Sequence, residues 1–141
     1  MRILSWNCKG ALHRKHHLVN DFRPDIAVLP ESEMLNEIPV ELGSKVPNSF
    51  VWDGNTDRKG LAVIGYDDFQ VKIADFYNPS IKWVIPIRVT GPKSFLLLAV
   101  WTLPDDVGSY VQPLFKAFND YKDQIDAQPT LWAGDFNASH L

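Results

Sequence analysis

Residues 24–31 of the sequence are Pro-Asp-Ile-Ala-Val-Leu-Pro-Glu. The aliphatic run between the two prolines predicts a short buried strand, because proline ends regular structure and branched aliphatic side chains favour strands. A carboxylate, Glu31, follows directly after this run. Functional groups of α/β proteins gather where parallel strands end, so Glu31 is the first candidate site residue.

The segment before this stretch completes a strand-helix-strand unit. Residues 3–6 predict a short strand, and the apolar residues Leu12, Val19 and Phe22 share one face of a helix that Pro24 ends. Two strands joined by a helix normally pair in parallel. We therefore expect both strands to end at the same edge of one sheet.

The segments after Glu31 predict further strands. Residues 32–48 have no clear period and are interrupted by prolines, which is typical of a loop. Four apolar segments separated by turn residues follow, and they predict an antiparallel meander. These segments are residues 50–52, 61–66, 69–76 and 81–89. Pro86, inside the last of them, favours an edge strand or a bulge at that point.

The last third of the chain predicts a central strand, a helix and a final strand. Residues 95–101 are apolar at every position, as expected of a strand covered on both faces. Apolar residues recur at helical spacing from Pro113 onward, and residues 130–133 predict a strand that leads into Gly-Asp-Phe-Asn at 134–137. The chain is thus one α/β domain, or part of one, with a mixed sheet and helices on one face.

Composition limits the classes of function. The 141 residues are 45% hydrophobic and 22% charged, which is typical of a globular protein. The formal net charge of −3 gives no general attraction to nucleic acid, so a polyanion would need metal ions or local basic clusters. The single cysteine, Cys8, excludes an intramolecular disulfide; we expect a small buried side chain and a reducing, cytoplasmic compartment. No segment is expected to target or span a membrane.

Polar side chains follow three of the predicted strands. Asn7 comes after the first strand, Glu31 after the second, and Asp135 with Asn137 after the last. We expect these four side chains to converge, because the carboxyl ends of strands collect site residues. Carboxylate and amide oxygens suit a hard cation that holds a phosphate, which favours Mg²⁺ or Mn²⁺.

Four segments resemble, in order and spacing, the successive motifs of the endonuclease/exonuclease/phosphatase superfamily. They are Ser-Trp-Asn at 5–7, the stretch at 24–31, Lys-Gly-Leu-Ala-Val at 59–63 and Gly-Asp-Phe-Asn at 134–137. The resemblance implies an α/β sandwich with two sheets packed face to face and helices outside. It also implies divalent-metal-dependent hydrolysis of a phosphate ester, with nucleic acid as the leading substrate.

The same resemblance implies roles for single residues. Glu31 would ligate the metal, and Asn7 would help to organise the metal and the phosphate. Asp135 would orient and deprotonate the attacking water, and Asn137 would donate a hydrogen bond in the same site. The reaction is then an in-line attack of water on phosphorus, with the cation screening the charge of the phosphoryl oxygens.

The sequence departs from the superfamily pattern in two places. Thr102 stands at a strand end where many members have histidine, and it becomes a candidate substrate-binding residue. The second half of the superfamily fold, which ends in a Ser-Asp-His motif, has no counterpart here. We therefore expect an incomplete sandwich of one sheet plus flanking helices. Its inner face, from residues 61–66 and 95–101, would need a second copy of the chain or a separate C-terminal half to cover it.

Several residues leave two interpretations open. Arg58 and Lys59 would either contact substrate phosphates or keep a hairpin soluble. Trp52 and Trp101 would either stack on bases or pack in the core. Three histidines near the first helix, with no matching carboxylate in the sequence nearby, favour a solvated basic face over a metal site; they are His13, His16 and His17.

Two alternatives to a nuclease also remain. The absence of the Ser-Asp-His half favours a non-catalytic half-domain that acts in binding or assembly. A lipid or small-molecule phosphatase of the same superfamily is the other alternative, because substrate choice depends on loops and not on the fold.

Overall fold

The computed structural model describes residues 1–34, 36, 45–56, 59–104 and 108–137. The first sheet has the strand order β1-β2-β4-β3. Its strands are β1 (Ile3–Ser5), β2 (Ile26–Ser32), β3 (Pro47–Thr56) and β4 (Lys59–Tyr66). As predicted, β1 and β2 pair in parallel, and α1 (Leu12–Asp21) connects them. The other pairs in this sheet are antiparallel.

The second sheet repeats this plan in the other half of the chain, with the strand order β5-β6-β7-β8. Its strands are β5 (Gln70–Ile73), β6 (Val84–Thr90), β7 (Phe95–Trp101) and β8 (Thr130–Asp135). β7 and β8 pair in parallel, and the helices α2 (Gln112–Asp120) and α3 (Lys122–Ala127) lie between them in the chain. Pro113 lies in the first turn of α2, as predicted.

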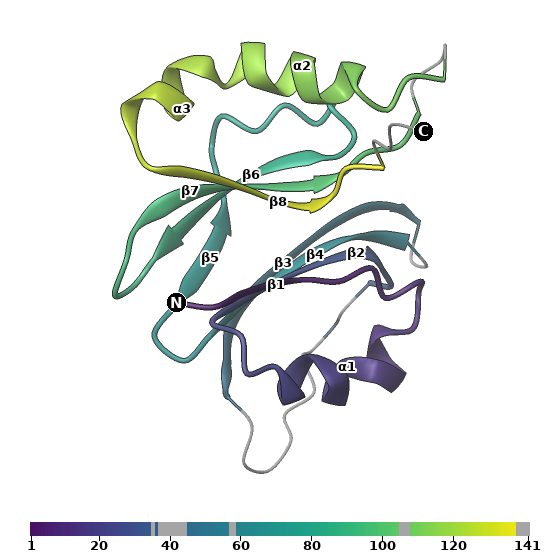
Figure 1. Cartoon of the computed structure of the whole chain (residues 1–141), viewed down its shortest axis with the longest axis vertical. Helices are drawn as coiled ribbons and strands as arrows, with labels where there is room; N and C mark the ends of the chain where they lie inside the picture. The colour runs from purple at the N-terminus through teal and green to yellow at the C-terminus, as the bar shows by residue number, and fades with distance from the viewer. Residues whose placement is uncertain (35, 37–44, 57–58, 105–107, 138–141) are drawn as a thin grey trace.

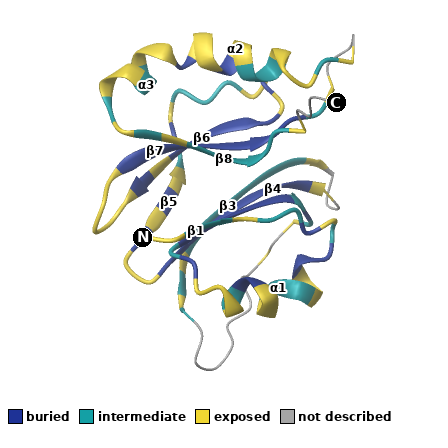
Figure 2. Ribbon diagram, in the orientation of Figure 1, coloured by how far each residue is buried: buried dark blue, intermediate teal, exposed yellow. Residues whose placement is uncertain are grey.

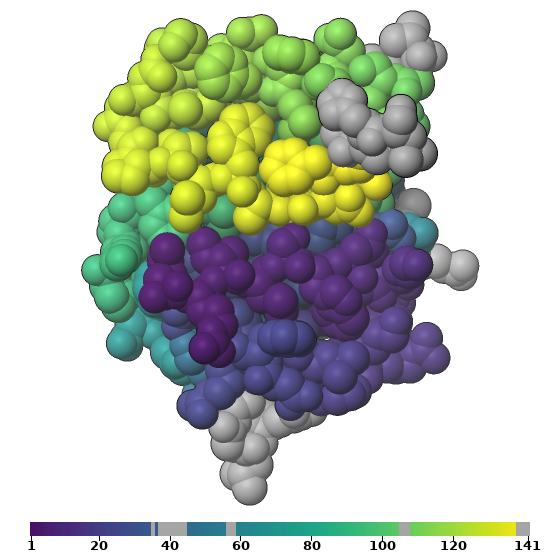
Figure 3. Space-filling model, viewed as in Figure 1, coloured from purple at the N-terminus to yellow at the C-terminus, as the bar shows by residue number. Residues whose placement is uncertain are grey.

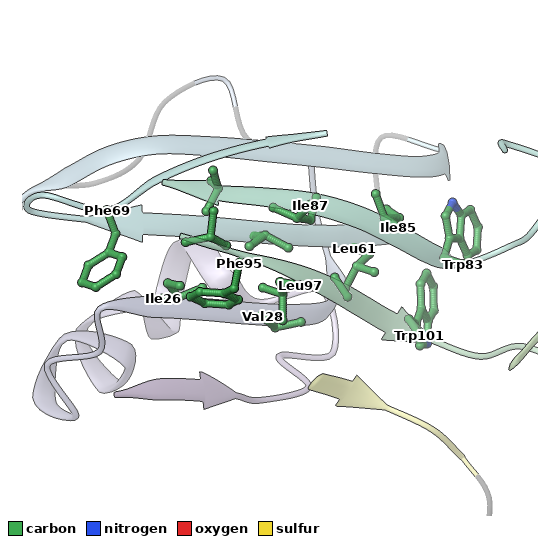
Figure 4. Close-up of a cluster of buried hydrophobic side chains, with 14 residues drawn as sticks. Ile26, Val28, Leu61, Phe69, Trp83, Ile85, Ile87, Phe95, Leu97 and Trp101 are labelled. Atoms are coloured by element: carbon green, nitrogen blue, oxygen red, sulfur yellow. The ribbon is translucent and has the colours of Figure 1, made fainter. Parts of the chain in front are cut away.

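The two sheets pack face to face, with α1 outside the first sheet and α2 and α3 outside the second (Figure 1). Side chains from both sheets form one buried layer between them (Figure 4). From the first sheet come Ile26, Val28, Leu61 and Val63, and from the second Ile85, Ile87, Leu97 and Ala99. The strand residues that alternate with these point outward and pack under the helices. Figure 2 shows the buried central strands between more exposed helices.

These layers confirm the α/β sandwich fold class, but the expectation of a single sheet is wrong. β3–β4 and β5–β6 are antiparallel pairs, as predicted, yet β4 and β5 belong to different sheets. The chain turns between them at Asp67, whose φ of 52° is left-handed. Residues 61–66 and 95–101 therefore cover each other, and the inner face needs no second copy of the chain.

Pro86 is also placed differently from the prediction. It pairs with Leu98 in regular register on β6, which lies between β5 and β7 and is neither an edge strand nor bulged at that point. The neighbouring strand β5 ends at Ile73, and the next residue, Ala74, donates its N–H to the Pro86 carbonyl at 2.8 Å. The proline is tolerated because its missing N–H falls beside the end of the neighbouring strand.

No helix within the described ranges combines the length and the apolar character needed to cross a bilayer. Most of the loop predicted at residues 32–48 lies outside the described residues, but Ser32 ends β2 and Pro47 begins β3.

Candidate active site

The carboxyl ends of β1, β2 and β8 meet at one edge of the sandwich, where the amide of Asn7 joins the two sheets. Its Nδ2 donates to Glu31 Oε1 at 2.9 Å and to Asp135 Oδ2 at 3.1 Å. Its Oδ1 accepts the Lys9 N–H at 3.0 Å, which fixes the orientation of the amide. A single nitrogen thus holds one carboxylate from each sheet, and the predicted convergence of these residues is observed.

Glu31 occupies a bulge in β2. The register with β4 shifts between Leu29 and Ser32, and Glu31 has a left-handed φ of 54°. The Glu31 carbonyl accepts the Gly10 N–H at 2.6 Å, which ties the bulge to the loop after β1. Bulges commonly redirect side chains beside functional sites, and here the bulge presents the Glu31 carboxylate to Asn7.

The Glu31 carboxylate is ionised. The hydrogen bond from Asn7 lowers its pKa most, and Lys59 lowers it further, against an opposing effect of partial burial. Lys59 Nζ lies 3.1 Å from Glu31 Oε2. Lys59 therefore lies beside Glu31 and contacts the carboxylate oxygen that Asn7 leaves open, and its contact with a substrate phosphate stays a prediction. Arg58, the other predicted basic residue, lies outside the described residues.

Gly134 allows Asp135 to reach the site. Its φ is +146°, and a Cβ at this position would lie 1.9 Å from the carbonyl oxygen of Val100. No other residue type fits here without moving β7 or β8. The close approach of the two strands places Asp135 opposite Trp101 at the strand ends.

The turn after β8 aims the Asp135 carboxylate. Its Oδ1 accepts the Asn137 N–H at 3.1 Å, so backbone and side chain close a tight turn in which Asn137 has a left-handed φ of 45°. Asn137 Nδ2 donates to the Thr102 carbonyl at 2.9 Å. The Thr102 hydroxyl is buried and donates to the Phe136 carbonyl at 2.5 Å. Thr102 thus fixes the turn, and substrate contact by its side chain stays a prediction.

Sequence reasoning missed one carboxylate near this site, Glu33. It accepts the N–H groups of Leu12 at 2.9 Å and of His13 at 2.5 Å, and so caps the first turn of α1. It also lies 2.6 Å from His13 Nδ1. His13 therefore has a carboxylate partner that the sequence did not indicate, although its side chain is exposed. The residues are 20 positions apart, and only the fold brings them together.

The remaining candidates are structural. Cys8 is buried, and burial raises the pKa of its thiol. Trp101 is 5% exposed and stacks on Trp83 in the core, with ring centroids 4.9 Å apart (Figure 4). Trp52 is half-buried, and its Nε1 donates to the Ser32 carbonyl at 3.1 Å. For Trp52 and Trp101 the structure shows core packing.

The side chains at this edge fit a hard divalent cation. Two carboxylates from different sheets flank one amide, and Glu31 already holds a cationic group, the Lys59 ammonium. Magnesium is commonly held by one or two protein carboxylates together with water and substrate oxygens. Within the described ranges, no group of three or more His, Cys, Asp or Glu side chains is arranged to hold a metal. Glu31 stays the candidate metal ligand, with Asp135 across the Asn7 amide from it.

The sequence matches no family model and no curated protein. Among solved structures, it is similar to the crystal structure of truncated TDP2 from Caenorhabditis elegans, with a TM-score of 0.69 at 17% sequence identity. The match covers 97% of this chain and 62% of that one. The similarity shows the α/β sandwich fold of the endonuclease/exonuclease/phosphatase type.

Proposed function

We propose that this chain carries the catalytic carboxylates of a divalent-metal-dependent phosphodiesterase, most readily a nuclease. One observation carries the proposal: Asn7 joins Glu31 and Asp135 across the two sheets, at the shared edge where their strands end. This arrangement has no role in the packed core, because all three side chains lie at strand ends. Preorganised groups of this kind are typical of sites that stabilise a charged transition state.

In this proposal Glu31 holds Mg²⁺ or Mn²⁺, and Asn7 orients the Glu31 carboxylate. The cation, when bound, screens the negative charge of the phosphoryl oxygens. Asp135 accepts a hydrogen bond from a water molecule and takes its proton as the new P–O bond forms. The bond from phosphorus to the leaving alkoxide breaks on the opposite side. Asn137 keeps the Asp135 carboxylate directed at the water, and Lys59 and Arg58 bind the substrate phosphate.

Activity of the purified protein on a substrate panel tests this function. The panel comprises plasmid DNA, an abasic-site duplex, RNA and small phosphomonoesters, each with Mg²⁺ or Mn²⁺. We expect cleavage of a polynucleotide that disappears in Asp135→Asn and persists in Asp68→Asn, which changes an exposed acid in the turn between the sheets. Release of phosphate from monoesters alone would replace the nuclease by a phosphatase. If the full-length or complemented protein cleaves none of these substrates, the proposal that it is an enzyme is wrong.

A binding or assembly module is the second candidate function. β1 and β8 are edge strands of their sheets within the described residues, and they lie side by side on one face of the molecule (Figure 3). Open strand edges accept further strands, and 38% of the C. elegans structure lies outside the match. We propose that a separate C-terminal half, or a second copy of the chain in a homodimer, pairs with these edges. Sedimentation of the chain alone and with the candidate half tests this pairing.

We also place the protein in the cytoplasm. The chain has a single cysteine, the buried Cys8, and so forms no intramolecular disulfide, as is typical of proteins in a reducing compartment. Microscopy of the tagged native protein tests this location.

A further inference from the structure

A pocket of about 730 Å³ lies beside the candidate active site, between the start of β6, the end of β7 and α2. Two segments lead to it from the site. Leu103 and Pro104 line the pocket and follow Thr102, whose carbonyl accepts the Asn137 amide. Asn55 lines it from the end of the β3–β4 hairpin, in which Thr56 pairs with Lys59. The pocket and the candidate site therefore share the edge of the sandwich at which β7 and β8 end.

The described lining of the pocket carries positive charge, in a chain of net charge −3. Lys82 and Lys116 line it, and no acidic side chain is among the described residues that line it. Lys82 donates to Asn55 Oδ1 at 3.1 Å, and Lys116 donates to Ser80 Oγ at 3.2 Å. Both partners are neutral, and neither lysine forms an ion pair with another described residue. Both ammonium groups can thus bind an anion without first leaving a carboxylate.

An exposed aromatic ring stands at the rim of the same pocket. Phe115 on α2 is 59% exposed, although its neighbour Leu114 packs in the core under the helix. Exposed aromatic rings in basic grooves bind unpaired bases by stacking, and every base has a face that can stack. The volume also lies in the range of pockets that hold small organic ligands.

We propose that this pocket binds a nucleotide unit of a single-stranded nucleic acid, next to the phosphate that is cleaved. Lys82 and Lys116 bind the backbone phosphate of that nucleotide, and Phe115 stacks on its base. A strand is favoured over a duplex because the bases of a duplex are stacked and paired, and so cannot lie on Phe115. The statement that this nucleotide lies next to the cleaved phosphate rests on the proposed phosphodiesterase function. Its binding in the pocket is independent of that function.

Fluorescence anisotropy of a labelled oligothymidylate tests the pocket without catalysis, because EDTA removes divalent cations. We expect the double variant Lys82→Gln/Lys116→Gln to bind at least tenfold more weakly than the unchanged protein. Its salt dependence should also fall, by about 0.7 in the logarithmic slope for each phosphate that the protein no longer neutralises. Phe115→Ala should weaken binding about fivefold or more without changing that slope.

Two lysines outside the pocket supply the matched control. Lys72 lies on β5 and Lys93 in the turn between β6 and β7, and both are exposed. Lys72→Gln/Lys93→Gln removes the same charge and should bind as the unchanged protein does. Equal weakening in the two double variants would show general charge attraction and overturn the pocket. Circular dichroism establishes that each variant is folded.

Further arms of the experiment define the ligand. Oligouridylate distinguishes RNA from DNA. If a blunt duplex binds more tightly than the single strand, with the same dependence on Lys82 and Lys116, the proposal of a single-stranded ligand is wrong. It is also wrong if no oligonucleotide binds. Binding that depends on the pocket, without cleavage in Mg²⁺, would support the nucleotide pocket and contradict the proposed phosphodiesterase. Cleavage with an unchanged KM in the Lys82→Gln/Lys116→Gln variant would support the phosphodiesterase and contradict the nucleotide pocket.

Discussion

The two sheets place one carboxylate each at the same edge by similar means, but they give it different partners. Both carboxylates belong to segments with left-handed backbone, at Glu31 itself and at Asn137 beside Asp135. The Glu31 carboxylate forms an ion pair with Lys59 and accepts a hydrogen bond from the Asn7 amide. Asp135 is bonded to Asn7 Nδ2 and the Asn137 N–H, and to no cation among the described residues. This difference is the reason why our proposal gives metal binding to Glu31 and proton transfer to Asp135.

The largest effect should follow from changing the second sheet's carboxylate. Asp135→Asn keeps the shape of the side chain but cannot take a proton from water, so turnover by an active full-length or complemented protein should fall at least about 100-fold. Asn137→Ala should act in the same direction, because it frees the turn. Steady-state kinetics with Asp68→Asn as control measure the loss. Turnover within a few-fold of the unchanged protein would remove Asp135 from the chemistry.

The first sheet's carboxylate should behave differently. Glu31→Gln can still accept the Asn7 hydrogen bond but has no charge, so Mg²⁺ and Mn²⁺ binding should drop below detection while the fold persists. Isothermal calorimetry measures the binding and circular dichroism the fold. Asp135→Asn should retain weaker but measurable binding, and equal loss in both variants would erase the distinction between the two carboxylates.

Stability should depend on Gly134 at the second sheet. Gly134→Ala places a methyl group against the Val100 carbonyl and requires a φ that alanine rarely adopts. The free energy of unfolding should fall by about 2 kcal/mol or more. Urea denaturation measures it, with Gly108→Ala as a comparison: Gly108 also has a positive φ, of +83°, but no described residue lies within 4 Å of the Cβ that the change adds. Equal stability of the two variants would contradict the close approach of β8 to β7.

A smaller effect should follow from removing the cation beside Glu31. Lys59→Gln takes away a positive charge 3.1 Å from Glu31 Oε2, where it would compete with a bound metal ion. Metal affinity should rise by about threefold to tenfold, as measured by calorimetry against Lys93→Gln. Weaker binding in Lys59→Gln would show that the lysine organises the ligand and does not compete with the metal.

The smallest effect concerns Glu33, two residues beyond Glu31. The N–H groups of His13 and Leu12 hold the pKa of Glu33 below its usual value despite burial. Glu33 therefore stabilises the fold fully above its unfolded pKa, and this contribution is lost as the pH falls through the lower folded pKa. Glu33→Gln should cost about 1 kcal/mol at pH 7 and less at a pH below the folded pKa of Glu33. Thermal unfolding at the two pH values measures it; a loss equal at both would mean that the charge of Glu33 is not involved.

The sequence alone predicted most strands and the helices, because these depend on local pattern. It predicted the convergence of Asn7, Glu31 and Asp135 from their positions after strand ends. Hydrophobic alternation marks which strand positions are buried, but it does not tell which sheet a strand joins. The division between β4 and β5 therefore escaped prediction, although Asp67 and Asp68 mark the turn. Glu33 escaped for a similar reason, since nothing in the sequence relates it to a helix end 20 residues earlier. The prediction of an edge strand or bulge at Pro86 was wrong because a proline is also tolerated inside a sheet where the neighbouring strand ends.

The Asn7 side chain also acts as a gauge between the two sheets. Its one nitrogen reaches Glu31 on its own sheet and Asp135 on the other. A sliding of one sheet over the other by about an ångström would lengthen one of these hydrogen bonds beyond its effective range. The hydrogen bonds of this single amide thus depend on how the two sheets are aligned. A change in packing that shifts one sheet against the other would change the spacing of the two carboxylates.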